Sequence, residues 1–344
     1  MILQAGTVFF QNIYIYGRKF EIELILEATD ANIELAAQEI LSGEVAAFPT
    51  ETVYGLGADG FNPIAVSKIF EVKNRPSFNP LILHISSFDQ LEEICEVNNP
   101  LVEELIHKFW PGPLTLVLPK KNIVPEIVTS GNPTVAVRMP RHEVATKLLK
   151  LVNRPVAAPS ANAFGFLSPT HASHVEKQLG SKIKIILDGG GSAVGIESTI
   201  LEASENEFIM LRPGGLSVEE IESITGKLGA KENNFDKPNS PGQINHHYAP
   251  NIPIKFIDEH SLKFCAPEKT AALFFSSNSA GINFSTEKVL SPTSDMHEAA
   301  ANLFKYLHEL ETSNAELILV EKVNASGLGI AIMDRLTKAV NRYS

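Results

Sequence analysis

The sequence predicts a two-domain α/β protein in which strands alternate with helices on both sides of a linker. Its 344 residues exceed the size of a typical single domain. Short apolar runs that stop at Pro49 and Pro159 alternate with segments of helical spacing, which is typical of an open α/β sheet. Residues 229–251 are rich in Asn, Pro, Lys and Gly and lack periodicity, so they separate the two units.

The composition excludes several classes of protein. The chain is 44% hydrophobic and 20% charged, with a net charge of −11, which argues against non-specific binding to nucleic acid or anionic membranes. The two cysteines, Cys95 and Cys265, lie far apart and outside any C-x-x-C, which excludes a disulfide framework and a cysteine-rich zinc site. Neither a signal-peptide pattern nor an apolar run of membrane-spanning length is present. We therefore expect a cytoplasmic protein without membrane contact.

The first domain begins with elements that lead to a polar loop. Alternating apolar positions in residues 1–28 predict one added strand, and residues 32–42 have helical spacing. A buried strand over residues 45–48 then precedes the sequence Thr-Glu-Thr at positions 50–52. Open α/β sheets bind ligands in loops just beyond the carboxyl ends of their strands, so this loop is a candidate site.

A pair of cations follows the next predicted helix, over residues 63–72. Lys73 and Arg75 are two positions apart, and in extended backbone this spacing places both on one face, where they suit a polyphosphate. A solvated basic pair is the alternative, because most charged side chains are solvated. The strand predicted over residues 81–85 carries His84, which by itself indicates a core histidine as readily as a ligand group.

Gly55, Gly57 and Gly60 form a G-x-G-x-x-G pattern that does not predict a dinucleotide site here. Residues 49–54 separate the preceding strand from the first glycine, although the fingerprint should begin at the strand end. Phe61 stands where a P-loop requires lysine.

The middle of the first domain carries one arginine in an otherwise apolar strand. Helical spacing over residues 91–109 leads to Trp110, which we expect to pack in the core, and to a strand over residues 114–118. The strand over residues 134–139 contains Arg138, and a buried cation needs a partner. That partner is either a substrate carboxylate or a structural Asp or Glu.

A second polar loop repeats the pattern of the first. A strand over residues 156–158 stops at Pro159, and Ser160 and Asn162 follow, two positions apart. Ser168 is expected to cap a helix that has Pro169 in its first turn. His171 and His174 have the i, i+3 spacing of metal ligands, but no carboxylate or cysteine lies in sequence reach, which favours a solvated helix face.

The remaining elements complete both domains. A strand over residues 183–187, the hydroxyl pair Ser198 and Thr199, and Arg212 at a turn end the first domain. Beyond the linker, strands and helices alternate in β-α-β-α order, which predicts a small parallel sheet. The strands are expected over residues 271–275 and 317–320, and the helices over residues 299–310 and from residue 330.

These segments, taken in order, resemble the YrdC-like family in its long two-domain form. The matching motifs include PTETVYGLG, KNRP, WPGPLT, VAVRMP, PSAN, GIESTI, LRPG and HYAP, and they extend from about residue 45 to the end. The resemblance implies a YrdC-like twisted open α/β sheet domain with a second, smaller Rossmann-like α/β domain. The implied divisions are an N-terminal extension (1–28), a catalytic domain (29–228), a linker (229–252) and a C-terminal domain (253–344).

The family resemblance also implies a site and a reaction. The reaction is L-threonylcarbamoyladenylate synthesis, in which L-threonine, bicarbonate and ATP form threonylcarbamoyl-AMP and pyrophosphate, and Mg²⁺ accompanies ATP without a dedicated protein metal site. Lys73 and Arg75 are the expected catalytic residues, because they would offset phosphate charge. The expected ATP-binding residues are Lys73, Arg75, Asn79, Thr134, Ser160, Asn162, Ser168, Arg212 and Tyr248. The expected L-threonine-binding residues are Thr52, His84, Arg138, Ala158 through its backbone, and Ser198.

The product would serve the modification of tRNA. The implied partners are the machinery that transfers the threonylcarbamoyl group to tRNA and, through a weak contact, tRNA itself. An RNA-binding or regulatory YrdC-like module is the alternative function, and the acidic total charge argues against it. Because Tyr248 is followed closely by Pro250 in HYAP, we also expect the linker to fold back over the cleft and place Tyr248 against the nucleotide.

Overall fold

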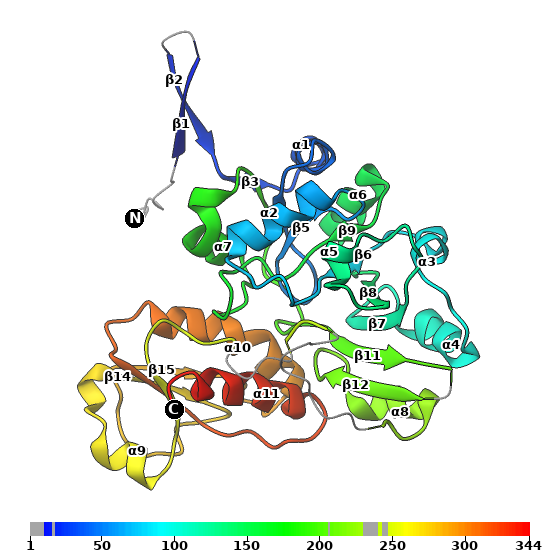
Figure 1. Cartoon of the computed structure of the whole chain (residues 1–344). Coiled ribbons are helices and arrows are strands. Elements are labelled where there is room, and N and C mark those ends of the chain that lie inside the picture. The colour runs from blue at the N-terminus through cyan, green and yellow to red at the C-terminus, as the bar shows by residue number, and fades with distance from the viewer. Residues whose placement is uncertain (1–9, 16–17, 206, 230–239, 243–246) are drawn as a thin grey trace.

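The computed structural model describes residues 10–15, 18–205, 207–229, 240–242 and 247–344 (Figure 1). Most of the predicted linker, residues 230–239 and 243–246, lies outside the described residues, as do residues 1–9. A search of the described helices for one long and apolar enough to cross a membrane found none.

A ten-stranded mixed sheet forms the first domain, as the predicted alternation of strands and helices requires. The short strands that precede the polar loops, β4 and β9, are separated in the sheet by β5 alone, so their loops emerge close together. In spatial order the strands are β12 (Phe208–Arg212), β11 (Thr199–Ala203), β7 (Leu114–Pro119), β8 (Thr134–Arg138), β6 (Ile82–His84), β9 (Val156–Ala157), β5 (Gly55–Asp59), β4 (Ala46–Phe48), β10 (Ile186–Asp188) and β3 (Ile25–Glu27).

The N-terminal residues form more than the single added strand that was expected. Strands β1 (Phe10–Ile15) and β2 (Arg18–Glu23) make an antiparallel pair that projects from the domain in Figure 1. Strand β3 pairs in parallel with β10 at the edge of the large sheet. Gly55 and Gly57 lie within β5 and Gly60 directly follows it, so the segment does not form a phosphate-binding turn and the dinucleotide interpretation is excluded.

The helices of the first domain begin at recognisable capping residues. Thr29 and Asn62 accept hydrogen bonds from backbone N–H groups at the starts of α1 and α2, and proline occupies the first turn of α2. The helices are α1 (Asp30–Leu41), α2 (Pro63–Lys73), α3 (Phe88–Ile94), α4 (Pro100–Phe109), α5 (Glu126–Thr129), α6 (Glu143–Val152), α7 (Ala172–Leu179) and α8 (Val218–Thr225).

The structure differs from the predicted elements at two helices. The helical spacing over residues 91–109 belongs to both α3 and α4, because Asn99 caps a new helix and Pro100 occupies its first turn. The helix predicted to start at Ser168 starts at Ala172 instead, and Ser168 does not cap it. Trp110 is buried as expected and donates a hydrogen bond to the carbonyl of Leu114.

The second domain is built on the small parallel sheet that its sequence predicts. The spatial order is β13 (Ile254–Phe256), β16 (Leu317–Val320), β14 (Thr270–Phe274) and β15 (Thr286–Val289), and all neighbours run in parallel. The helices of this domain are α9 (Glu259–Phe264), α10 (Met296–Glu311) and α11 (Leu328–Asn341). In Figure 1, α10 and α11 lie on the side of this sheet that faces the first domain.

The two domains share a hydrophobic core. Val53, Leu167 and Ile196 of the first domain pack in one cluster with Leu303 and Phe304 of α10. Because Val53 lies in the first polar loop and Leu167 follows the second, docking of the second domain restrains the backbone of those loops.

One face of α11 directs cations at the first domain and the linker. Arg335, Lys338 and Arg342 recur at i, i+3 and i+7, a spacing that places them on one side of a helix. They donate to the carbonyls of Pro213, Gly242 and Gly165, respectively. The interface therefore combines apolar packing with the hydrogen bonds of these cations.

Gly195 permits the close approach of the catalytic-domain loop to α10. Its φ angle is +74°, and a Cβ atom built at this position would lie 2.4 Å from Ala301 Cα. We expect Gly195→Ala to lower the free energy of unfolding by about 3 kcal/mol, because backbone strain is added to a clash with helix backbone. Denaturant unfolding would measure the loss, and limited proteolysis would report separation of the domains.

Gly190→Ala is the matched control. Gly190 has a φ angle of +83°, but nothing lies within 4 Å of a Cβ atom built there. This variant should lose only about 1 kcal/mol, the cost of the backbone conformation. Equal losses in both variants would show that the contact with α10 is unimportant.

Candidate active site

A pocket lies where the two polar loops meet the carboxyl ends of β6 and β8. The residues expected to bind L-threonine all line it: Thr52, His84, Arg138, Ala158 and Ser198. Of the residues expected to bind ATP, Arg75, Ser160, Arg212 and Tyr248 line the same pocket. Thr50, Glu197, Gly242 and His247 also contribute to its wall.

Arg138 makes several contacts with protein groups in this ligand-free structure. Its Nη2 atom lies 2.6 Å from Glu51 Oε1, its Nη1 atom donates to Thr52 Oγ1 at 2.8 Å, and its Nε atom donates to the Gly112 carbonyl at 3.1 Å. In the absence of substrate, the partner of Arg138 is therefore the structural acid Glu51, one of the two alternatives that the sequence leaves open. A substrate carboxylate at Arg138 would have to share the guanidinium with Glu51 or displace it.

His84 is a buried and neutral side chain. Burial, with a smaller contribution from the Arg138 charge, lowers the pKa of His84 to about 3. Its ring lies edge-on to Phe48, with centroids 6.3 Å apart. A neutral imidazole can orient a hydroxyl or an ammonium group by hydrogen bonding, which suits a binding role at neutral pH.

Two other arginines of the pocket, Arg75 and Arg212, are held mainly by main-chain carbonyls. Arg75 donates to the carbonyls of Asn79 and Pro80 at 3.1 and 2.8 Å. Arg212 donates to the carbonyl of Ser198 through Nε at 3.1 Å and Nη2 at 2.9 Å. Carbonyl dipoles satisfy hydrogen bonds but leave the charge uncancelled, so these guanidinium groups make the pocket attractive to an anion.

Lys73 and Asn162 donate hydrogen bonds to backbone carbonyls of the second polar loop and so hold its shape. Lys73 is buried, and its Nζ atom donates to the carbonyls of Ser160 and Asn162. Burial and the nearby Arg75 charge hold the pKa of Lys73 well below its usual value. The Asn162 side chain donates to the carbonyls of Ala163 and Phe166 at 2.8 and 2.9 Å. Neither side chain is among the residues that line the pocket.

Asn79 precedes β6 and Thr134 is the first residue of β8, whereas the opposite ends of these strands reach the pocket. Arg138 is the last residue of β8. The side-chain amide of Asn79 is buried, and neither its oxygen nor its nitrogen has a hydrogen-bond partner among the described residues. A buried amide without partners is costly, so a ligand atom at this position would relieve the cost.

Ser168 has a different role from the helix cap that was expected. Its hydroxyl donates to the buried carboxylate of Glu197. Glu197 lines the pocket although it is not among the expected binding residues, and Glu51 belongs to the candidate Thr-Glu-Thr loop without an expected binding role. Both stand beside hydroxyl residues in matched motifs, PTET and GIEST, and that position was the available signal.

The linker end lies against the pocket. Tyr248 is buried, has a φ angle of +63°, and packs against Phe304 of α10 with ring centroids 5.8 Å apart. Gly242 admits it, because a Cβ atom at Gly242 would lie 2.7 Å from Tyr248 Oη and 2.8 Å from Arg212 Cδ. The expected fold-back therefore brings Tyr248 to the pocket, and its contact with a nucleotide stays a prediction.

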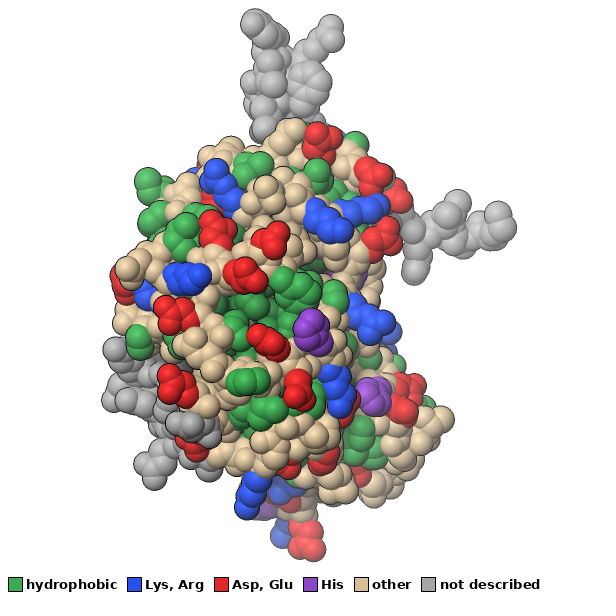
Figure 2. Space-filling model, turned by 90° about the vertical axis from the view of Figure 1, so that its right-hand side faces the viewer, with side chains coloured by type: hydrophobic (Ala, Val, Ile, Leu, Met, Phe, Trp, Pro, Cys, Tyr) green, Lys and Arg blue, Asp and Glu red, His purple; other side chains and the backbone are tan. Residues whose placement is uncertain are grey.

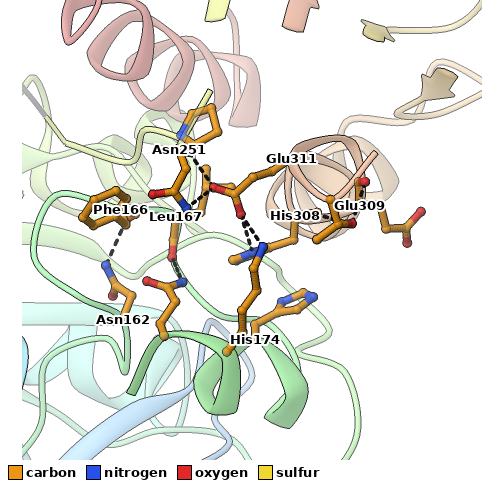
Figure 3. A network of polar contacts seen from close by, with 12 residues as sticks. Asn162, Phe166, Leu167, His174, Asn251, His308, Glu309 and Glu311 are labelled. Carbon is orange, nitrogen blue, oxygen red and sulfur yellow. Dashed lines mark hydrogen bonds and ion pairs between the residues drawn. The ribbon is translucent and has the colours of Figure 1, made fainter. Parts of the chain in front are cut away.

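The histidines with metal-ligand spacing instead take part in the domain interface (Figure 3). His174 stacks on His308 of α10, with ring centroids 3.9 Å apart, so the solvated helix face expected here is wrong. Lys177 and Asn251 both contact the carboxylate of Glu311 beside this pair. Among the described residues, no group of three or more His, Cys, Asp or Glu side chains could hold a metal ion.

Comparisons with known proteins agree on one family. Residues 38–214 match the Sua5/YciO/YrdC family model, described as telomere recombination, and residues 216–340 match the C-terminal domain of threonylcarbamoyl-AMP synthase. A threonylcarbamoyl-AMP synthase of Pyrococcus abyssi is 43% identical, covering 89% of this chain and 93% of the relative. The enzyme of the same name from Bacillus subtilis is 39% identical, covering 91% and 94%. The crystal structure of P. abyssi Sua5 complexed with L-threonine has a TM-score of 0.85 and 41% identity, covering 93% of this chain and 97% of that chain.

The stacked histidines predict a domain interface that weakens in acid. Burial, offset in part by Glu311, lowers the pKa of His308 from 6.5 to about 4. Below pH 6.5 the unfolded chain binds more protons than the folded chain, so stability falls as the pH falls toward the folded pKa. The charged and titratable groups that act on the pair are His171, which precedes α7, Lys177 on α7 and Glu311 on α10. Lys305, Glu309 and Asp188 act on His171.

We expect His308→Gln to flatten this pH dependence. Glutamine does not titrate and can still donate to the Ser168 carbonyl, which His308 Nε2 contacts at 3.1 Å. At about pH 5.5 the native protein should have lost about 1 kcal/mol more than this variant, relative to neutral pH. Denaturant unfolding at several pH values measures the difference. Parallel pH profiles for the two proteins would contradict the assignment.

Proposed function

The chain belongs to the family of two-domain threonylcarbamoyl-AMP synthases, and we propose that its pocket binds L-threonine and ATP together with bicarbonate. It is an enzyme of the nucleotidyltransferase class. The observation that carries the proposal is that the residues expected for L-threonine line the same pocket as Arg75, Ser160, Arg212 and Tyr248, expected for ATP. A common pocket would let the carbamate of threonine meet the α-phosphate of ATP.

The proposed chemistry needs alignment and positive charge rather than a strong base. The neutral threonine amino group condenses with bicarbonate to a carbamate, with release of water, and a carbamate oxygen attacks the α-phosphorus while pyrophosphate leaves. Arg75 and Arg212 would stabilise the phosphate charge, while buried Lys73 would hold the backbone around Ser160. Arg138 would receive the threonine carboxylate.

Mg²⁺ would enter as part of the substrate MgATP. The carboxylates near the pocket, Glu51 and Glu197, are already paired with Arg138 and Arg335. Protein ligands are therefore scarce, and Mg²⁺ commonly keeps several waters while it binds substrate phosphates. When bound, it would neutralise charge on the leaving pyrophosphate.

We further propose that the product is consumed by the machinery that transfers threonylcarbamoyl groups to tRNA, in the cytoplasm. The described cysteines, Cys95 and Cys265, are free thiols, which is consistent with a reducing compartment. On the face shown in Figure 2, basic and acidic side chains are interspersed rather than gathered into one basic patch. This distribution supports at most a weak tRNA contact on that face and disfavours the alternative of an RNA-binding module.

Pyrophosphate exchange tests the function directly. Labelled pyrophosphate should exchange into ATP only when L-threonine and bicarbonate are both present. The adenylate must first form, and its reverse reaction with labelled pyrophosphate then gives labelled ATP. Omission of either compound is the internal control. Absence of exchange, together with tight tRNA binding, would replace the enzyme with the RNA-binding alternative.

Arg138→Lys tests the carboxylate contact. Lysine keeps the charge but lacks the planar two-point contact, so the KM for threonine should rise about tenfold or more while the KM for ATP changes less than about twofold. Arg154→Lys is the matched control, because Arg154 pairs with Asp59 in a partly exposed contact and is absent from the pocket wall. Equal changes in both KM values for Arg138→Lys would mark Arg138 as a structural ion-pair partner of Glu51.

A further inference from the structure

Arg335 is a buried cation that crosses between the two domains. It lies on α11, its side chain has 0% exposed surface, and its Nε atom donates to Glu197 Oε2 at 2.9 Å. Its Nη1 atom donates to the carbonyl of Pro213 at 2.7 Å. Its guanidinium carbon lies 5.0 Å from the centre of the Tyr248 ring. A single side chain of the second domain therefore contacts several parts of the pocket wall.

Glu197 connects this contact to nucleotide binding. Its buried carboxylate lines the pocket and accepts the hydrogen bonds of Ser168 and Arg335. Burial acts to raise the pKa of Glu197, but the Arg335 and Arg212 charges outweigh it and hold the pKa below its usual value. The carboxylate is therefore ionised at neutral pH. A fixed anion in the wall of a polyphosphate site repels the ligand unless a cation cancels its charge.

The other arginines at the pocket direct their hydrogen bonds elsewhere. Arg212 donates to the carbonyl and hydroxyl of Ser198, and Arg75 donates to carbonyls of the loop before β6. Within the part of the chain that the structure describes, the ion pair of Glu197 is made with Arg335. The direct ion-pair partner of Glu197 thus comes from the C-terminal domain, where Arg335 also contacts Asp334, and the Arg212 charge of the first domain acts on Glu197 without such a contact.

We propose that Arg335 is a positioning residue for ATP, an inference that rests on the function proposed above. By pairing with Glu197 it cancels the negative charge in the pocket wall, so that Glu197 can hold the Ser168 hydroxyl without repelling phosphate. By stacking on Tyr248 it also fixes the aromatic side of the pocket. The first domain alone would present an unpaired carboxylate to ATP, and docking of α11 removes that obstacle.

The test is a double-mutant cycle on the full chain, with steady-state synthesis of threonylcarbamoyl-AMP as the readout. Arg335→Met removes the charge at similar volume and should raise the KM for ATP about tenfold or more, because Glu197 is left unpaired. The KM for threonine should change less than about threefold. Adding Glu197→Gln to Arg335→Met should return the KM for ATP to within about threefold of the native value, because the repelling charge is gone.

Two further variants separate charge from packing. Arg335→Lys keeps the cation and should retain most of the ATP affinity while losing the forked contact. Arg342→Met is the matched control on the same face of α11, since Arg342 donates to the Gly165 carbonyl and stacks on Phe166 without approaching Glu197. Its KM for ATP should stay within about twofold of native. Thermal unfolding of each variant verifies that the fold is retained.

The outcomes distinguish this inference from the proposed function. A native protein that makes no threonylcarbamoyl-AMP would overturn the function. An active native protein whose double variant is as defective toward ATP as Arg335→Met would overturn the role of charge. Equal increases in both KM values, or an equal defect in Arg342→Met, would show that Arg335 only docks the domains. If Arg335→Met alone is unfolded, the comparison of Arg335→Lys with the double variant still decides the question.

Discussion

Burial of positive charge is the constraint on which the pocket depends. Removing an unpaired ion from water costs several kcal/mol, so each buried cation must meet an acceptor. The chain meets this need by directing loop carbonyls and buried carboxylates at Lys73, Arg75, Arg138, Arg212 and Arg335. Because most of these acceptors are uncharged, the pocket stays electropositive within a chain whose net charge is −11. The polar loops thus take their shape from the cations they surround.

The same constraint accounts for the position of the second domain. The apolar side chains of α10 cover Val53 and Ile196, while α11 presents Arg335 to Glu197. The second domain can therefore affect the chemistry without binding a ligand itself. It acts by packing against the loops of the first domain and by pairing Arg335 with the negative charge of Glu197.

Local patterns in the sequence predicted most of the fold and many of the residues that gather at the pocket. Strands that stop at Pro49 and Pro159 have short-range signals, and the structure places their loops together. The wrong predictions concern residues whose contacts are with segments far away in the sequence. The position of Ser168 before Pro169 predicts a helix cap, but its hydroxyl donates to Glu197, 29 positions away. The stacking of His174 on a histidine of the second domain likewise leaves no periodic signal.

The wide sequence separation between Glu197 and Arg335, 138 positions, has a kinetic consequence. Contacts between distant residues form slowly, because the chain must lose loop entropy before they can stabilise it. Each domain has its own sheet and can acquire it earlier through contacts that are closer in sequence. We therefore expect the contact of Arg335 with the pocket wall to form late in folding, when the two largely formed domains associate.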